Sequence, residues 1–200
     1  MTGVDHPTHR RSDAVRSVTL LTDAVGRLLH GGRVDFSIPE LASAAGVGVA
    51  TAYRHFAAPS EALQAYADRA VAQLGEALAD IDHELAPVER FREHCARWVA
   101  QAREWGPAVR HIRSHEGYIE RLRKDDRAIR GLHTILEGVL DDLVQAGLMP
   151  ATDPVFAVLL WITIFDERVI YDLAEHHGWS TEQITERLSA ATADALHIGR

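Results

Sequence analysis

The fold of this chain is decided by residues 36–56, whose sequence is FSIPELASAAGVGVATAYRHF. Ser37 and Glu40 have the spacing of a capping box, in which the serine hydroxyl accepts the third helical N–H and the glutamate accepts the serine N–H. Phe36 precedes this cap and Leu41 stands at the fourth helical position, which is the arrangement of a hydrophobic staple. The pattern therefore predicts that a helix begins directly after Ser37.

A glycine-rich segment, residues 46–48, separates this helix, expected at 38–45, from a second short helix at 49–55. Helices of this length are unstable alone in water, so the two need a common core with the helix that precedes them. Two short helices joined by a glycine turn form a helix-turn-helix, whose second helix enters the major groove of DNA. The sequence thus predicts a DNA-binding head.

The residue types of the second helix suit contact with DNA. The side chains at 48–51 (Gly-Val-Ala-Thr) are small, so the backbone can come close to base edges. Tyr53, Arg54 and His55 follow with a phenol, a guanidinium and an imidazole. A buried helix would not carry these three side chains in succession, so we expect the helix to be exposed.

Residues 36–56 resemble the DNA-binding signature of the TetR family: a helix of small residues, Ala-Gly-Val at the turn, then Thr-x-Tyr-x-x-Phe. The strict match covers roughly residues 34–66, about a sixth of the chain. The resemblance implies an all-α protein with an N-terminal three-helix helix-turn-helix domain and a C-terminal helical domain for ligand binding and dimerisation. It implies a ligand-responsive repressor that binds a palindromic operator as a homodimer and is released by a small-molecule inducer.

These implications give a domain plan and a set of DNA contacts. We expect a flexible tail at residues 1–10, a DNA-binding domain at 11–56, and an effector-binding and dimerisation domain at 57–200. The expected DNA contacts are Arg16, Ser37, Gly48, Val49, Thr51, Tyr53, Arg54 and His55.

The chain departs from the family pattern after the recognition helix. A lysine that touches phosphate commonly follows the last aromatic residue there, whereas this chain has Ala-Ala-Pro-Ser at 57–60. DNA binding would then depend on Tyr53, Arg54, His55 and the arginines at positions 10, 11 and 16. We therefore expect a weaker dependence on salt than for a lysine-rich relative.

Charge is unevenly distributed along the 200 residues, whose formal net charge is −8. Residues 1–55 hold six arginines and five acidic residues, and the remainder holds fifteen basic and twenty-four acidic residues. A nearly neutral head can bind DNA if its arginines share one face. The longest apolar run, 155–165, is too short for a membrane span of about 20 residues. No export signal is recognisable and Cys95 is the single cysteine, so we expect a cytoplasmic protein.

Hydrophobic periodicity predicts helices and no strands along the whole chain. The first helix is expected to begin at Asp13 with Ser12 as its N-cap, and Ser180 to Gln183 form a second capping box before the last helix. Between 107 and 124 we expect one or two short helices with a break near Gly117. The other expected helices lie at 59–83, 87–105, 125–147 and 153–176.

The C-terminal helices suggest how a dimer and a ligand site would form. The 153–176 helix is apolar over most of its circumference, so it must be buried on two sides. Together with a stripe of Ile184, Leu188 and Ala191, it predicts a homodimer through the last two helices. The candidate ligand-binding residues, which also have the spacing of ordinary core residues, are Trp98, Trp105, Tyr118, His133, Trp161 and Phe165.

Other functions have weaker support in the sequence. No Ser-His-Asp set, glycine-rich phosphate loop or HExxH motif is present, so we expect no enzyme and no cofactor. His111 and His115 have the i, i+4 spacing of metal ligands, but no third ligand is fixed, so we expect no metal site. The alternative that remains open is a helical sensor of the same fold that no longer binds DNA and acts through protein contacts.

Overall fold

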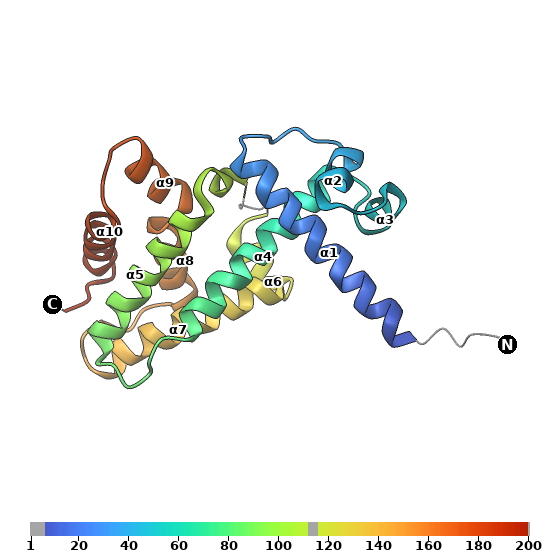
Figure 1. Ribbon diagram of the computed structural model, residues 1–200. Helices are drawn as coiled ribbons and strands as arrows, with labels where there is room; N and C mark the ends of the chain where they lie inside the picture. The colour runs from blue at the N-terminus through green and yellow to red at the C-terminus, as the bar shows by residue number, and fades with distance from the viewer. Residues whose placement is uncertain (1–6, 112–115, 200) are drawn as a thin grey trace. The chain divides into compact units, whose positions relative to one another are not determined.

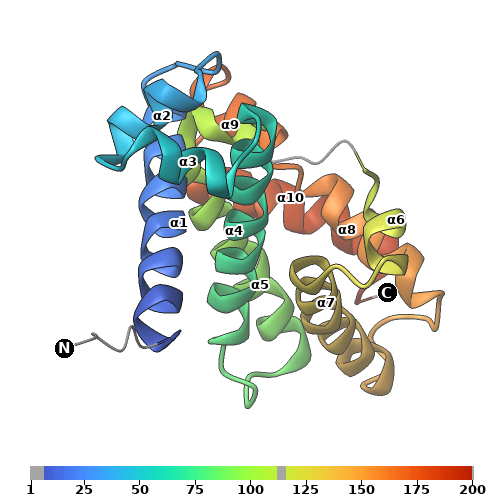
Figure 2. The ribbon, with the colours of Figure 1, turned by 90° about the vertical axis from the view of Figure 1, so that its right-hand side faces the viewer.

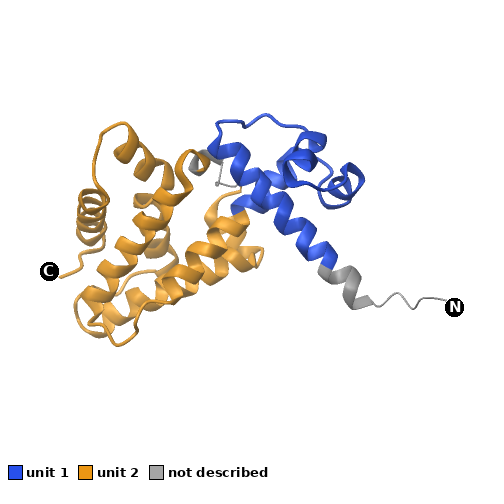
Figure 3. Cartoon of the chain, viewed as in Figure 1, with its two compact units in different colours: residues 1–67 blue, residues 68–200 orange. Residues whose placement is uncertain are grey.

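The computed structural model describes residues 7–111 and 116–199, with side chains from 13 to 108 and from 116 to 199. Within these residues the chain is helical and contains no strand, which confirms the all-α prediction (Figure 1). Its contacts divide it into two compact units, residues 1–67 and 68–200 (Figure 3). Helix α4 (Pro59–Ala79) contains the boundary, so it contributes to both units.

The first unit consists of α1 (Pro7–His30), α2 (Ile38–Ala45), α3 (Val49–His55) and the first turns of α4. Helix α1 packs against α2 and α3, which also pack against each other at one end of α1 (Figure 2). Their shared core is almost completely shielded from solvent. It includes Leu21, Val25, Leu41, Ala52 and Phe56.

Local sequence fixes the two short helices. The Ser37 Oγ accepts the Glu40 N–H at 3.4 Å, and the Glu40 carboxylate accepts the Ser37 N–H at 2.8 Å, which confirms the predicted capping box. Helix α2 ends at Gly46, whose φ of 67° is strained for residues with a Cβ. The Val47 N–H then donates to the carbonyl of Ala42 and closes the turn before α3.

The boundaries of the first unit differ from the expected ones. Helix α1 begins at Pro7, so Ser12 is not its N-cap and part of the expected tail is helical. Proline suits a first helical turn because the N–H that it lacks would have no helical partner there. At the other end, the unit extends past residue 56 because Tyr66 is buried against α1. A Cβ on Gly26 would lie only 3.0 Å from the Tyr66 ring.

The second unit is built around α5 (Pro87–Trp105), which packs against α7, α9 and α10. Its buried face includes Phe91, Cys95, Trp98 and Val99. Burial raises the pKa of the Cys95 thiol to about 12, so this side chain is inert packing material. The remaining elements are η1 (Gly106–His111), α6 (Tyr118–Arg123), α7 (Arg127–Gln145), α8 (Pro154–Ile164), α9 (Glu167–Glu175) and α10 (Thr181–Leu196).

The prediction of a single helix at 153–176 is wrong. The chain forms two helices there, α8 and α9, with a break at Phe165 and Asp166. The Asp166 carboxylate accepts the Arg168 N–H at 2.9 Å and so starts α9. Helix α8 is likewise capped by Asp153, whose carboxylate accepts the Phe156 N–H at 2.8 Å. The apolar pattern continues across the break, which is why periodicity did not reveal it.

Helix α10 begins at the predicted capping box of Ser180 and Gln183. It packs against α5 and α8, and this packing buries Ile184 and Leu188 within the chain itself. Ala191 is exposed, so the stripe assigned to a dimer interface belongs mostly to the core of one subunit. No helix in the described part of the chain combines the length and the apolarity needed to cross a membrane.

Candidate functional site

Helix α3 presents polar and apolar side chains to solvent on one side and is anchored on the other. Ala52 and the following Phe56 are buried in the core of the first unit. Val49 is 45% and Tyr53 is 52% exposed, unusual values for large hydrophobic side chains. Among the other predicted contacts, Gly48, the residue before α3, and Arg54 are exposed. Thr51 and His55 are partly buried.

The arginines of the first unit fall into two groups. Arg27 donates to the carbonyl of Ala44 at 2.8 Å, and Arg33 forms an ion pair with Glu40 at 2.7 Å. Arg16 and Arg54 are exposed and form no ion pair within the described residues. Arg10 and Arg11, which were also expected to contact DNA, lie on α1, but their side chains are not among those that the structure describes. Two cations, one on α1 and one on α3, are thus available to a polyanion.

Glu40 links the cap of α2 to the charge of Arg33. The N–H and hydroxyl of Ser37 and the guanidinium of Arg33 lower the pKa of Glu40 from 4.5 to about 2. The Ser37 hydroxyl lies 2.8 Å from the Glu40 carboxylate, so this predicted DNA contact is engaged in starting α2. Glu40 remains ionised at neutral pH and offsets the charge of Arg33.

A cavity of about 350 Å³ lies in the second unit, among α4 to α8 and the start of α9. Its volume is in the range of sites for small organic molecules. Six of its thirteen lining residues are large aliphatic ones, and Trp98, Tyr118 and Arg121 contribute ring and polar surface. The other lining residues are Val71, Leu74, Glu116, Gly117, Ile129, Leu132, Leu159, Ile162, Thr163 and Glu167.

The six predicted ligand-binding residues have different positions relative to this cavity. Trp98 and Tyr118 line it, and the Tyr118 hydroxyl shares a hydrogen bond of 2.5 Å with Nδ1 of His133. Trp161 and Phe165 lie behind the wall, with ring centroids 6.5 Å apart, and Phe165 packs on Trp98 at 5.7 Å. Trp105 is buried elsewhere and does not line the cavity. Aromatic spacing alone could not separate cavity wall from core.

Sequence reasoning missed Arg121, whose side chain is only 7% exposed. Its guanidinium contacts the carboxylates of Asp68 at 2.8 Å and Asp126 at 2.7 Å. Burial of a charge is tolerated because both partners are carboxylates. Arg121 stands close to Arg123 and Lys124, a pattern typical of a solvated helix end. The adjacent Asp125-Asp126 pair was the available signal that one of these cations is paired.

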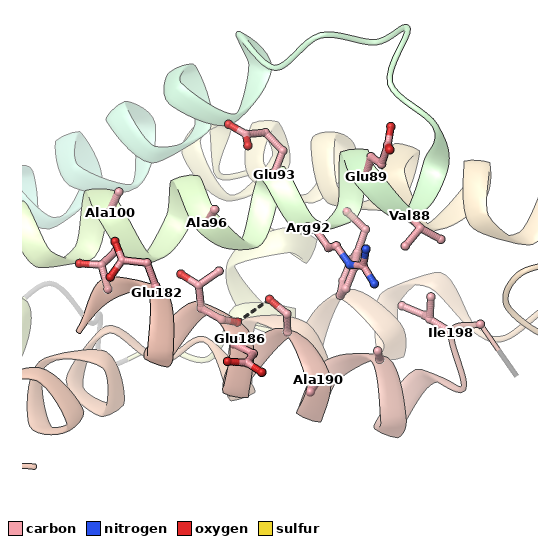
Figure 4. A pocket seen from close by; sticks show the side chains of 16 residues that line it. Val88, Glu89, Arg92, Glu93, Ala96, Ala100, Glu182, Glu186, Ala190 and Ile198 are labelled. Atoms are coloured by element: carbon pink, nitrogen blue, oxygen red, sulfur yellow. Dashed lines mark hydrogen bonds between the residues drawn. The ribbon is translucent and has the colours of Figure 1, made fainter. Parts of the chain in front are cut away.

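A second hollow of about 1030 Å³ lies between α5 and α10 (Figure 4). Its lining includes Glu182, Glu186 and Arg92, and five of its sixteen residues are alanine or serine. None of the predicted ligand-binding residues lines it, and Phe91 is its single aromatic residue. Small side chains offer a ligand few contacts, so the smaller cavity is the better candidate site.

Histidine, cysteine and carboxylate side chains do not gather into a metal site in the described part of the chain. No group of three or more metal-ligating side chains comes together there. His111 and His115 are outside the described side chains.

No protein-family model and no curated protein matches this sequence. Solved structures match the fold over both units. A TetR-family transcriptional regulator from Haemophilus influenzae is 19% identical with a TM-score of 0.64, covering 91% of this chain and 97% of that one. FadR from Bacillus subtilis in complex with stearoyl-CoA is 18% identical with a TM-score of 0.67, covering 91% and 98%. LfrR from Mycobacterium smegmatis in complex with proflavine is 19% identical with a TM-score of 0.62, covering 89% and 94%.

Proposed function

We propose that this chain, which has the fold of TetR-family transcriptional regulators, is itself a ligand-responsive regulator that binds double-stranded operator DNA as a homodimer. The observation that carries this function is the exposed surface of α3 in one unit together with a small-molecule cavity in the other. The protein acts in the cytoplasm as a repressor at a palindromic operator, and its inducer releases it.

In this proposal α3 is the helix that enters the major groove. Val49 makes apolar contact with thymine methyl groups, and the absence of a side chain at Gly48 lets the backbone approach the base edges. Thr51, Tyr53 and Arg54 reach base edges and phosphates. The supporting contacts to the DNA backbone come from Arg16 on α1, His55 on α3 and Ser37 at the start of α2.

The inducer occupies the cavity of the second unit. Trp98 and Tyr118 contact it, and His133 orients the Tyr118 hydroxyl through their shared hydrogen bond. Trp161 and Phe165 support the wall from behind, and Trp105 has a structural role. FadR and LfrR, which carry stearoyl-CoA and proflavine in their structures, support a ligand site in this fold without indicating which ligand this chain binds.

Release depends on how the two heads of a dimer are spaced. Recognition helices must lie about one DNA turn apart, roughly 34–36 Å, to read two half-sites at once. Helix α4 belongs to both units, so a ligand that moves its second part acts on its first part as well. An inducer releases DNA if it binds more tightly to the state with the wrong spacing.

The dimer forms through α8 and α10. Helix α8 buries Ala157, Val158 and Trp161 in its own subunit, yet Phe156 remains 56% exposed. A large apolar side chain at the surface of an otherwise apolar helix indicates a contact with another chain. Small residues on the exposed side of α10, such as Ala191, allow close approach of a second copy.

The second candidate function is a sensor of the same fold that does not bind DNA. Two observations favour it: the Ala-Ala-Pro-Ser sequence after α3, and the engagement of Arg27 and Arg33 within the first unit. These features reduce the positive charge that a head offers to phosphate.

A gel-shift assay at moderate salt with the DNA upstream of the gene for this protein separates the two functions. We expect specific retardation by the wild type, and a loss of affinity of about 10- to 1000-fold when Tyr53→Ala and Arg54→Ala are combined. Arg187→Ala, which removes an exposed arginine of α10, is the matched control and keeps wild-type affinity. Absence of specific retardation by the wild type would favour the sensor, and full affinity of the double variant would exclude α3 as the reading helix.

A further inference from the structure

Most polar side chains around the cavity of the second unit already have a partner within the protein. Glu116 pairs with Lys124 at 2.8 Å, and Tyr118 shares its hydrogen bond with His133 at 2.5 Å. The Thr163 hydroxyl donates to the carbonyl of Leu159 at 2.7 Å. These groups therefore gain little from a ligand, because each would have to exchange one partner for another.

Trp98 is the exception. Its side chain is fully buried at the cavity wall, and its indole N–H finds no acceptor among the residues that the structure describes. A buried donor without an acceptor is rare and unfavourable, since it has lost its water and gained nothing in exchange. A ligand oxygen that accepts this N–H would remove that penalty, so the indole favours a ligand with an acceptor.

The charges near the cavity act against an anionic ligand. The guanidinium of Arg121 is already held by Asp68 and Asp126. Together with Glu116 and Glu167 these carboxylates outnumber Arg121 and Lys124, the two cations found near the cavity among the side chains that the structure describes. A carboxylate or phosphate entering the cavity would meet repulsion and would have to compete with two acidic side chains for Arg121.

We propose that the ligand of this cavity is a compact, mainly apolar molecule without negative charge, whose carbonyl or ether oxygen accepts the N–H of Trp98; this presupposes that the cavity is the effector site. A volume of about 350 Å³ holds a molecule of two or three fused rings and excludes a nucleotide-bearing ligand. Because Trp98 is fully buried, the ligand reaches its N–H only after neighbouring side chains rotate aside.

Isothermal titration calorimetry on the full-length protein with three naphthalene probes tests the ligand class. The probes are 2-acetylnaphthalene, which is neutral with an acceptor, 2-ethylnaphthalene, which lacks the acceptor, and 2-naphthoate, which is an anion of similar shape. We expect the ketone to bind at least about tenfold more tightly than the carboxylate. Equal or tighter binding of 2-naphthoate would overturn the inference, as would the absence of binding by all three probes at about 1 mM.

Two matched variants test the role of the indole. Trp98→Phe removes the N–H and keeps an aromatic ring, and it should weaken the ketone about 3- to 10-fold while leaving 2-ethylnaphthalene unchanged within about twofold. Trp105→Phe removes the indole N–H of another buried tryptophan, one that does not line the cavity, so it should leave both probes unchanged. Equal weakening of both probes by Trp98→Phe, or equal effects of the two variants, would contradict the proposed hydrogen bond.

A gel shift in the presence of the ketone separates this inference from the proposed function. If the ketone binds with the expected dependence on Trp98 but does not release DNA, the ligand class stands and the inducer role fails. If DNA binding by α3 is confirmed while 2-naphthoate is the preferred probe, the regulator stands and the ligand class fails.

Discussion

Two arginines that pair with carboxylates, one in each unit of this protein, stand in contrasting environments. In the first unit Arg33 and Glu40 meet at the surface, with 51% and 49% of their side chains exposed. In the second unit Arg121 is almost completely buried and contacts two carboxylates at once. Arg33 remains at the surface of the first unit, where a charged polymer can meet it, whereas Arg121 is enclosed at the wall of the mainly apolar cavity in the second unit.

Replacing the buried arginine should have the largest effect. Arg121→Met removes the guanidinium that contacts Asp68 and Asp126 and should lower the free energy of unfolding by about 2–3 kcal/mol, a value reduced from that of a fully buried pair because both carboxylates are partly exposed. Urea unfolding followed by circular dichroism measures the change. Arg33→Met is the matched control at the surface and should shift the midpoint much less. Equal shifts would remove the contrast between the units.

Changing the exposed apolar side of α8 should weaken the proposed dimer and have little effect on the folding of one subunit. Phe156→Glu places a charge in the proposed subunit interface and should raise the dimer dissociation constant at least about tenfold. Sedimentation velocity measures it. Ile119→Glu changes another exposed apolar residue, 44% exposed on α6, and should leave the dimer intact. A dimer that survives Phe156→Glu would place the interface on another surface.

The few available arginines of the first unit predict a modest salt dependence of DNA binding. Among the described side chains of the first unit, Arg16 and Arg54 are the exposed arginines without an ion pair or hydrogen bond, and two such residues in each subunit give about four phosphate contacts and a slope near −4 in a plot of log K against log salt. Fluorescence anisotropy between low and moderate salt gives the slope, and Arg54→Ala should reduce its magnitude by about two. A slope well beyond −6 would mean that cations other than these carry the binding.

The smallest effect concerns Glu40. Because the folded protein holds the pKa of Glu40 at about 2, below its ordinary 4.5, ionised Glu40 stabilises the fold above about pH 4.5. That contribution is lost as the pH falls towards 2. Glu40→Gln keeps an acceptor for the Ser37 N–H but removes the charge, so its melting temperature should be lower than that of the wild type at pH 6. The difference should shrink as the solution is acidified, and a constant difference would show that the charge is irrelevant.

The sequence was most informative where structure is local. Both capping boxes, at Ser37 and at Ser180, and the turn at Gly46 are formed as predicted, because each depends on a few consecutive residues. The break at Asp166 was missed because the helix signal, apolar spacing, continues on both sides of it. A residue that can cap a helix can also lie inside one, and tertiary packing decides which of these two positions it takes.

The cavity was less predictable than the head. Val71, Ile129 and Leu159 line it from three helices, and nothing in their local sequence distinguishes them from ordinary core residues. Arg121 was hidden for the opposite reason, because a cation in a basic run normally faces water. Which side chains surround a hollow depends on how distant segments meet, and spacing along one helix carries no information on that.

The ion pairs of Arg121 also connect the wall of the cavity to α4 and to the start of α7. The same guanidinium holds Asp126, whose carboxylate starts α7 by accepting the N–H groups of Ala128 and Ile129, and Asp68, the first residue of the second unit on α4. A ligand in the cavity that displaces this side chain would loosen the start of α7 and the ion pair of Asp68 together. Asp68 directly follows Ala67, the last residue of the first unit, so this ion pair lies where the chain passes from one unit to the other within α4.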